Sequence, residues 1–374
     1  MTAKDEVQKR YASRRSRALS RAREDRKVDW LLVTLPEDVG YLSGFTGEDS
    51  VLLVGPDQQA VLITDGRYDE QAARECRGID IAVRAGALSA AIAEQIKDRR
   101  ITKPGFQAEH VTVQMRDGIE EKIAKSRKLV PLRGVLSDTR VSKDAEEVAA
   151  IRKAIRVAQR AFKELTAGGR KSFIGRTEAE VAADLDYRMR RMGASAPAFE
   201  TIVAAGAHGS LPHYRPGKTK IRPDQAVLID WGAKVDGYCS DLTRVVFTGT
   251  IPPKIEEIYT VVLRAQKAAI SAIKAQVSCK AVDAAARKII EQAGYGEQFI
   301  HGLGHGIGLQ IHEAPSVGRR SDKRLRQGMV VTVEPGIYLP GVGGVRIEDD
   351  VLVEANGQRK LTSLPKTLKT MVLR

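Results

Sequence analysis

The pattern of hydrophobic and polar residues changes near residue 140, and the change predicts two domains. Before that point, short apolar runs predict β-strands at residues 28–34, 50–54 and 60–64. Helical patterns begin near Tyr68 and Ala87, and strands that alternate with helices are typical of an α/β domain. After that point, apolar residues recur at helical spacing from residue 145 to residue 165 and predict a long helix.

The second domain repeats an order of elements. Further helical patterns follow the first long helix at residues 177–192, 253–273 and 280–293. Each pair of helices precedes two strand-like segments that carry acidic residues, which indicates an internal duplication. A chain of 374 residues is long enough for two substantial cores. We therefore expect the domains to span residues 1–140 and 141–374.

Two aspartates lie in the first acidic pair of strands. Asp230 ends the apolar run at residues 226–229, and a carboxylate is rarely buried unless something positive compensates its charge. The Asp-Gly step at residues 236–237 favours a two-residue hairpin turn. In the register that this turn sets, Asp241 faces Gly232, so that Asp230 and Asp241 point to the same side of the hairpin.

Two glutamates lie in the second acidic pair of strands. Glu334 follows the apolar run at residues 330–333, and a glycine-rich turn at residues 340–344 precedes the next strand. A turn centred near Gly341 places Glu334 opposite Glu348, so that both side chains share one face. A slip by one residue would send the two glutamates to opposite faces.

A glycine-rich segment between the two hairpins holds three of the six histidines, at residues 301–313. With His305, the acidic residues make a set of five candidate metal ligands: Asp230, Asp241, His305, Glu334 and Glu348. This hard, oxygen-rich set suits two divalent ions, with Mn²⁺ as the first choice and Co²⁺, Zn²⁺ or Fe²⁺ as alternatives. Two such ions roughly 3.5 to 4 Å apart can share a hydroxide and stabilise charge on a carbonyl, which favours hydrolysis.

These segments resemble the pita-bread metallopeptidases, a family that includes methionine aminopeptidase, Xaa-Pro aminopeptidase and prolidase. The similar motifs lie at residues 229–233, 238–244, 304–308, 312–313, 333–336 and 345–349. Residues 41–47 and 62–68 look like the amino-terminal domain of the Xaa-Pro branch, which methionine aminopeptidases lack. The resemblance implies a creatinase-like and prolidase-like α/β amino-terminal domain followed by an α+β pita-bread catalytic domain.

The resemblance also implies roles for the residues of the site. Asp241 and Glu348 would bridge both ions, and Glu334 would carry a proton from the bridging water to the leaving amine. Four residues would bind substrate, of which three would also take part in catalysis. The substrate-binding set is His213, His301, His312 and Arg346, and the catalytic set is His213, His312, Glu334 and Arg346.

Other interpretations stay open for single residues. A buried aspartate could cap a turn or pair with Arg244 or Arg346, but five candidates in matching order favour a metal site. Two residues depart from the family pattern, Trp231 and Val245, and could change the shape of the pocket. His208 and His110 are interpreted as a polar loop residue and a structural residue.

The formal net charge of +14 needs its own explanation. Residues 1–27 hold ten Lys or Arg against four Asp or Glu, and a basic arm can bind nucleic acid or acidic membranes. No aromatic platform or binding motif accompanies it, so we favour a solvated helix face. The three cysteines form no CxxC motif, which fits a reducing cytoplasm. No apolar run is long enough to span a membrane.

The sequence therefore predicts a cytoplasmic, homodimeric metallo-exopeptidase. Through a dinuclear metal-bridged hydroxide, it would hydrolyse the peptide bond before proline, as an Xaa-Pro aminopeptidase or an Xaa-Pro dipeptidase (prolidase). Its partner would be a proline-containing peptide or dipeptide, with neither membrane nor nucleic acid expected. The alternative is a catalytically silent pita-bread-fold protein whose basic surface binds nucleic acid or protein. Metal-free, salt-sensitive nucleic-acid binding would favour that alternative.

Overall fold

The computed structural model describes residues 3–374, with side chains from residue 6 onward. Contacts within it define two compact units, Met1–Thr139 and Arg140–Arg374. The predicted division, into residues 1–140 and 141–374, lies next to this boundary. Each unit has its own sheets and its own core, and the two are described separately.

The first unit is built on one six-stranded sheet with the order β4-β3-β2-β1-β5-β6. Its strands are β1 (Trp30–Val33), β2 (Val51–Val54), β3 (Ala60–Asp65), β4 (Asp80–Arg84), β5 (Pro104–Gln107) and β6 (Val130–Leu132). Helices α2 (Pro36–Ser43), α3 (Asp69–Glu75), α4 (Leu88–Asp98), α5 (Val113–Glu120) and α6 (Val135–Arg140) alternate with them. The three predicted strands and the α/β character are confirmed. These strands are continuous apolar runs because both of their faces are buried.

The basic amino-terminal segment forms helix α1 (Ala3–Arg26), and residues 1 and 2 of that segment lie outside the described residues. The expected solvated face is present, but not every basic residue of the helix lies on it. Arg14 and Arg15 are buried, and their guanidinium groups donate to the carbonyl oxygens of Tyr41 and Leu42 at 3.3 and 2.9 Å. Two of the basic residues therefore attach the helix to its own unit, while others, such as Arg17, face solvent.

The predicted helices of the second unit are all present. They are α7 (Ala145–Ala167), α8 (Glu178–Arg191), α9 (Pro253–Ala272) and α10 (Cys279–Gln292), with α11 (Leu368–Met371) near the carboxyl end. Helix α7 begins with a capping box in which the Asp144 side chain accepts from the Glu147 amide. Thr177 and Glu180 make the same arrangement at the start of α8, and such caps satisfy amides that the first turn leaves free.

The aspartate pair lies in the hairpin formed by β9 (Ala226–Trp231) and β12 (Leu242–Phe247), with β10 (Ala233–Val235) and β11 (Tyr238–Cys239) at its tip. Val235 pairs with Tyr238 across the turn, and Thr243 pairs with Asp230. The predicted register is therefore correct. It follows from the turn, because Asp236 and Gly237 adopt φ of 50° and 82°, as a tight two-residue hairpin requires.

The glutamate pair lies in the segment of β15 (Val330–Val333), β16 (Gly336–Leu339), β17 (Gly343–Arg346) and β18 (Asp349–Val353). Gly336 pairs with Arg346 near the turn, and Val333 pairs with Asp349 beyond it. The predicted register is again correct, although Glu334 and Glu348 lie where the strands are interrupted. Short strands β7 (Ala196–Pro197), β8 (Ile202–Ala205), β13 (Gly304–Gly306), β14 (Glu313–Val317) and β19 (Gln358–Lys360) complete the unit.

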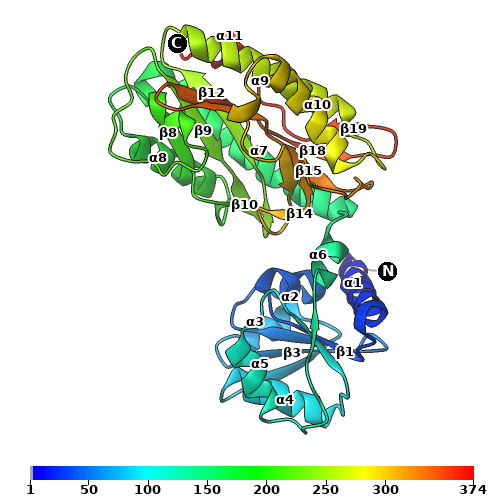
Figure 1. The fold of residues 1–374 in the computed structure, drawn as a ribbon. Coiled ribbons are helices and arrows are strands. Elements are labelled where there is room, and N and C mark those ends of the chain that lie inside the picture. The colour runs from blue at the N-terminus through cyan, green and yellow to red at the C-terminus, as the bar shows by residue number, and fades with distance from the viewer. Residues whose placement is uncertain (1–2) are drawn as a thin grey trace. The chain divides into compact units, whose positions relative to one another are not determined.

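Helices cover the hairpin strands on both faces, as Figure 1 shows for α9 and α10 on one side and α8 on the other. Leu228 of β9 packs into a core cluster with Ile258 of α9, whereas Ile229 packs into another cluster with Leu185 of α8. Successive residues of a strand point to opposite faces. This double burial explains why the strands before the acidic residues are uniformly apolar.

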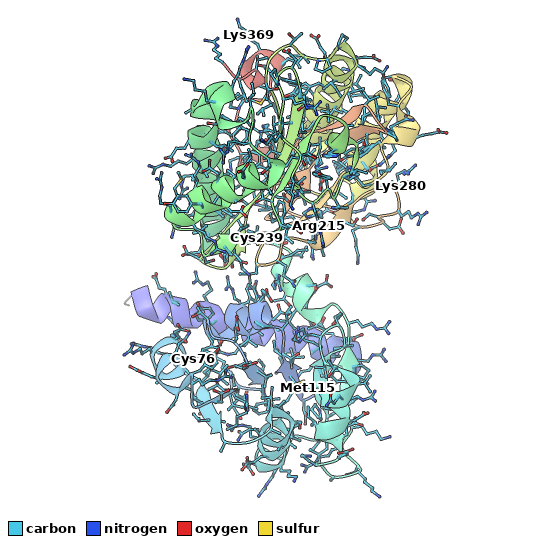
Figure 2. The ribbon with its side chains drawn as sticks, turned by 90° about the vertical axis from the view of Figure 1, so that its left-hand side faces the viewer. Cys76, Met115, Arg215, Cys239, Lys280 and Lys369 are labelled. Atoms are coloured by element: carbon cyan, nitrogen blue, oxygen red, sulfur yellow. The ribbon has the colours of Figure 1, made fainter. Side chains whose placement is uncertain are left out.

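Three buried free cysteines lie in the two units, Cys76 in the first and Cys239 and Cys279 in the second. Figure 2 labels Cys76 and Cys239. Cys239 packs in an apolar cluster with Ile151 and Ile307, as expected of a small apolar filler. Within residues 3–374, no helix combines the length and the apolar character that a membrane crossing requires.

Candidate metal centre and substrate cavity

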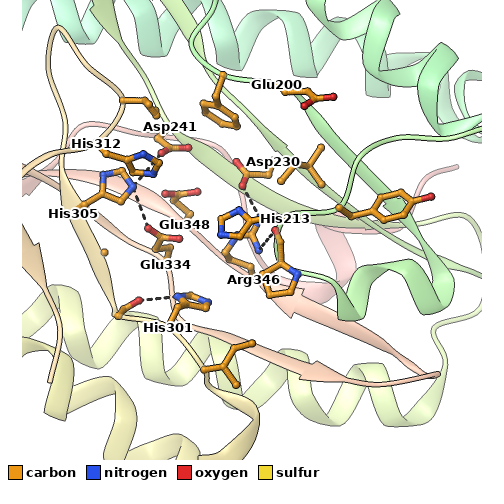
Figure 3. Close-up of a pocket in the computed structure, with 18 of the residues that line it drawn as sticks. Glu200, His213, Asp230, Asp241, His301, His305, His312, Glu334, Arg346 and Glu348 are labelled. Carbon is orange, nitrogen blue, oxygen red and sulfur yellow. Dashed lines mark hydrogen bonds and ion pairs between the residues drawn. The ribbon is translucent and has the colours of Figure 1, made fainter. Parts of the chain in front are cut away.

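A cavity of about 740 Å³ in the second unit brings the predicted site residues together. All five candidate ligands line it, and so do the four predicted substrate-binding residues, as the close-up in Figure 3 shows. The ligands come from both hairpins and from β13, segments far apart in sequence. Apolar side chains complete the wall, among them Phe199, Ile202, Ile300 and Ile311. Concave sites with a few convergent polar groups are typical of small-molecule binding.

Three of the five candidates form a compact group. Ligand atoms of Asp241, His305 and Glu348 all lie within 4.8 Å of one another. Glu334 joins them, because His305 Nε2 lies 3.3 Å from Glu334 Oε1 and 3.5 Å from Asp241 Oδ2. In Figure 3 the side chains of these four residues converge on one point.

The imidazole of His305 is oriented as a metal ligand needs to be. Its Nδ1 lies 3.0 Å from the carbonyl oxygen of Gly306, which can only accept, so Nδ1 carries the proton. Burial lowers the pKa of His305 to about 4, so the ring is neutral at pH 7. Nε2 therefore presents a lone pair toward two carboxylates. The lone pair and the carboxylates repel one another, and a cation between them would relieve that repulsion.

The buried carboxylates also call for positive charge. Burial, together with the neighbouring carboxylates, raises the pKa of Asp241 and Glu348 well above their ordinary values, and burial raises that of Glu334 to about 7. Asp230 Oδ1 and Glu348 Oε1 are buried without a hydrogen-bond partner in the described part of the chain. Unsatisfied buried oxygens are costly, and divalent cations would satisfy them. The residues present therefore fit the expected ions.

Asp230 also has the partner that sequence reasoning left open as an alternative. Its Oδ2 accepts from Arg346 Nη2 at 2.5 Å, across the two hairpins. Arg346 Nε donates to Thr243 Oγ1 at 3.1 Å, and that hydroxyl donates to Glu348 Oε2 at 2.7 Å. The ion pair and the ligand cluster are therefore parts of one network. Arg346 orients two of the candidate ligands, one directly and one through a hydroxyl.

His301 lines the cavity, but both of its ring nitrogens are engaged. Nδ1 lies 2.7 Å from the carbonyl oxygen of Gly302, and Nε2 lies 2.9 Å from the hydroxyl of Tyr338. Arg346 Nη1 donates to the same hydroxyl at 2.8 Å. Because Nδ1 must donate to the carbonyl, Nε2 accepts from Tyr338. This geometry makes His301 a support for Arg346, whereas its predicted contact with substrate stays a prediction.

His213 and His312 are both exposed to the cavity. The ring of His312 lies 4.4 Å from that of His305, edge to face. Glu313, next in the chain, is buried and paired with Arg140 and, at 3.0 Å, with Lys143 Nζ. Those two cations hold the pKa of Glu313 below its ordinary value despite its burial, which opposes the shift. The ion pairs anchor the segment that presents His312.

Four residues without a role in the sequence prediction support the candidate ligands or the predicted substrate-binding residues: Thr243, Thr332, Tyr338 and Glu313. Thr332 Oγ1 accepts from the His305 amide at 3.0 Å and donates to Glu334 Oε1 at 3.0 Å. A signal for three of the four was present. Residues two or four apart on a strand share a face, so Thr243 follows from Asp241, and Thr332 and Tyr338 follow from Glu334.

The two departures from the family pattern do not shape the cavity, contrary to expectation. The ring of Trp231 stacks on Phe162 at 4.4 Å, and its indole nitrogen donates to the Ala158 carbonyl of α7 at 3.0 Å. Val245 is fully buried in the core on the face of the hairpin opposite to Trp231. Neither residue lines the cavity. Arg244 pairs with Asp349 at 2.8 Å and not with Asp230.

The remaining two histidines lie outside the cavity lining. His208 Nδ1 lies 2.9 Å from Glu178 Oε1, and the ring stacks on Tyr214. His110 Nδ1 lies 2.9 Å from Thr34 Oγ1 in the first unit. Both rings therefore have local structural partners.

Comparisons with known proteins identify the family of this chain. The family model described as metallopeptidase family M24 matches residues 149–355, and that of the creatinase/prolidase N-terminal domain matches residues 15–142. The chain is 38% identical over 341 residues to the uncharacterized peptidase YqhT of Bacillus subtilis, covering 91% of this chain and 95% of that protein. It is 44% identical over 238 residues to the Xaa-Pro dipeptidase of Pyrococcus furiosus, covering 63% and 66%.

A solved structure of similar fold matches the chain along nearly its full length. The Xaa-Pro dipeptidase from Bacillus anthracis superposes with a TM-score of 0.92 at 38% identity, covering 97% of this chain and 100% of that one. The predicted fold, a creatinase-like domain followed by a pita-bread domain, is thereby confirmed. With a family model that matches more than half of its residues and a close relative along nearly its full length, the chain belongs to metallopeptidase family M24.

Proposed function

We propose that this protein is a metal-dependent exopeptidase of the Xaa-Pro dipeptidase type, which hydrolyses the peptide bond before proline. One observation carries the proposal: the neutral imidazole of His305 and the carboxylates of Asp241, Glu334 and Glu348 converge at one point of a cavity. Relatives with the same fold are named Xaa-Pro dipeptidases. The alternative of a silent binding protein leaves this costly cluster of buried charge without a purpose.

Asp230, Asp241, His305, Glu334 and Glu348 would hold two divalent ions, with Mn²⁺ as our first choice. Such ions lower the pKa of a water molecule and polarise the scissile carbonyl. Asp241 and Glu348 are the two most buried of these five residues. We also propose a homodimer and a cytoplasmic location, both of which stay predictions.

The chain's own residues would move the proton and hold the substrate. Glu334, whose pKa burial raises to about 7, can take a proton from the attacking water and give it to the proline nitrogen as that nitrogen leaves. His213 and His312, on two sides of the cavity, would donate to the scissile carbonyl oxygen as it gains charge. The apolar wall offers a surface for the pyrrolidine ring.

Release of proline from Xaa-Pro dipeptides and Xaa-Pro-containing tripeptides, with Mn²⁺ or Co²⁺ added, tests the proposal. Cleavage of dipeptides alone identifies a dipeptidase, and cleavage of tripeptides identifies an aminopeptidase. Absence of metal-dependent cleavage of both would refute the function.

The variant Glu334→Ala tests the assignment of the proton carrier. We expect it to lose activity and much of its bound metal, measured by elemental analysis of the purified protein. The matched control is Glu200→Ala, which removes an exposed glutamate that lines the same cavity but lies outside the ligand cluster. Full activity in Glu334→Ala would contradict the role given to Glu334.

A further inference from the structure

Glu178, the first residue of α8, is a fully buried carboxylate that does not line the cavity. Four donors surround its two oxygens. Oε1 accepts from the Ala205 amide at 2.8 Å and from His208 Nδ1 at 2.9 Å. Oε2 accepts from the Tyr214 hydroxyl at 2.7 Å and, more weakly, from the Gly217 amide at 3.4 Å. A carboxylate that accepts this many bonds is held in one orientation.

All four donors belong to one segment, residues 205–217, which we call the His213 loop. It begins at the end of β8, passes through a short 3₁₀ turn at Gly206–Ser210, and returns toward the start of α8. Glu178 therefore binds the loop near both of its ends. The backbone adds to this attachment, because the amides of Glu178 and Ala179 donate to the carbonyl oxygens of Thr219 and Gly217.

The middle of the loop presents His213 to the cavity. The His213 side chain is exposed, and its ring makes no hydrogen bond within the described residues, so the place of His213 depends on the backbone of the loop. Pro212, the preceding residue, accepts from Arg346 Nη1 at a long 3.4 Å. Tyr214, the following residue, is fixed by Glu178 and by stacking on His208 with ring centres 4.5 Å apart. Figure 3 shows His213 beside Arg346 and Asp230.

We propose that Glu178 is a positioning residue for His213: it orders the His213 loop so that the imidazole reaches the scissile carbonyl. The inference rests on the proposed function for its catalytic consequence, but the ordering of the loop can be measured without it. Glu178 touches neither substrate nor metal ligand. It acts only through the residues it holds.

The variant Glu178→Gln keeps the shape of the side chain and replaces one acceptor oxygen by an NH₂ group. That group would face a backbone amide in either orientation, Ala205 N or Gly217 N, which can only donate, so at least one bond to the loop is lost. We expect kcat to fall between about tenfold and a hundredfold, with a smaller change in KM and with unchanged metal content. The matched control is Glu180→Gln, an exposed cap in the same helical turn, which should keep wild-type activity.

A second variant guards against a folding defect in the first. Tyr214→Phe removes only one of the four bonds and keeps the stacked ring. It should show a smaller fall in kcat than Glu178→Gln. A double-mutant cycle with His213→Ala then separates positioning from general damage. If Glu178 acts through His213, Glu178→Gln should cost little once His213 is absent, whereas an equal loss in both backgrounds would overturn the inference.

Hydrogen exchange gives a readout independent of catalysis. Amides of residues 206–217 should exchange faster in Glu178→Gln than in wild type or Glu180→Gln, because local opening becomes easier. Unchanged exchange and unchanged kcat would refute the positioning role. If wild-type protein cleaves no Xaa-Pro substrate, the proposed function fails, while the exchange result still decides whether Glu178 orders the loop.

Discussion

The aspartate hairpin and the glutamate hairpin have the same kind of strand pairing, but their acidic residues lie at different positions in it. In each, an aspartate stands opposite a threonine: Asp230 opposite Thr243 in the first, and Asp350 opposite Thr332 in the second. The acid and the hydroxyl have exchanged strands between the two hairpins. The first aspartate lines the cavity and pairs with Arg346, whereas the second does not line it.

Asp350 shows how an aspartate is held at the related position of the other hairpin, where no cationic side chain among the described residues pairs with it. One of its oxygens accepts from the Asp241 amide at 3.2 Å, and the other has no hydrogen-bond partner in the described part of the chain. Burial raises the pKa of Asp350 well above its ordinary value. Burial therefore opposes ionisation of this carboxyl. Position within the hairpin, and not residue type alone, decides which aspartate can serve as a ligand.

Each hairpin also supports a carboxylate of the other. Arg346 of the glutamate hairpin holds Asp230, and Thr243 of the aspartate hairpin holds Glu348. The support is unequal, since one is a full charge and the other a neutral hydroxyl. Four carboxylates against one guanidinium leave a surplus of negative charge that divalent ions can balance.

Of the variants considered in this section, removal of the Arg346 guanidinium should have the largest effect on stability, because it removes the support that the glutamate hairpin gives to Asp230. In Arg346→Leu, Asp230 keeps its buried position but loses its fixed counter-charge. Loss of one partner of a buried ion pair typically costs about 3 to 5 kcal/mol, so we expect a metal-free protein destabilised by that amount. Urea unfolding measures the change. Saturating metal should recover part of it, and equal destabilisation with and without metal would show that Asp230 binds no ion.

The registers of both hairpins could be predicted because their turns fix them locally. The Asp-Gly step and the glycine near residue 341 set the pairing of residues many positions away. The choice of Arg346 over Arg244 as the partner of Asp230 could not be predicted. It depends on how the two hairpins approach each other, and no local pattern reports that.

The role of Glu178 could not be predicted either, because its contacts also depend on segments distant in sequence. It lies in the first turn of a helix, where an acidic residue is ordinary, and its partners are 27 to 39 residues away along the chain. Arg14 and Arg15 are similar, because composition placed them on a solvated face and packing buried them. Periodicity reports the face on which a residue lies, but not what that face meets.

The pH dependence of stability should differ between the metal-free and metal-loaded protein. Burial raises the pKa of Glu334 from its ordinary value to about 7, so the folded metal-free protein binds a proton that the unfolded chain releases above about pH 4.5. Stability of the metal-free form should therefore decrease as pH rises from about 5 to about 7. Metal binding needs deprotonated carboxylates, so the stabilisation by metal should grow over the same interval.

Thermal unfolding at several pH values, with a chelator or with saturating Mn²⁺, measures both effects. The two Tm curves should converge toward acid pH and separate toward neutral pH. Parallel curves would mean that the cluster does not exchange protons for metal. Glu200→Gln, which alters an exposed residue of the same cavity, should leave the separation unchanged.

The smallest expected effect is the sharpest test of the comparison. Asp350→Asn replaces a carboxyl that lies outside the cavity lining, and whose ionisation burial opposes, by an amide of the same shape, whose oxygen can still accept from the Asp241 amide. We expect a change of about 1 kcal/mol or less in stability, with near wild-type activity and metal content. Asp230→Asn makes the same substitution at the related position of the other hairpin, where the charge pairs with Arg346 and faces the cavity. It should lose metal and most activity, because an amide cannot replace an anionic ligand. If the two variants behaved alike, position in the hairpin would not determine ligand character.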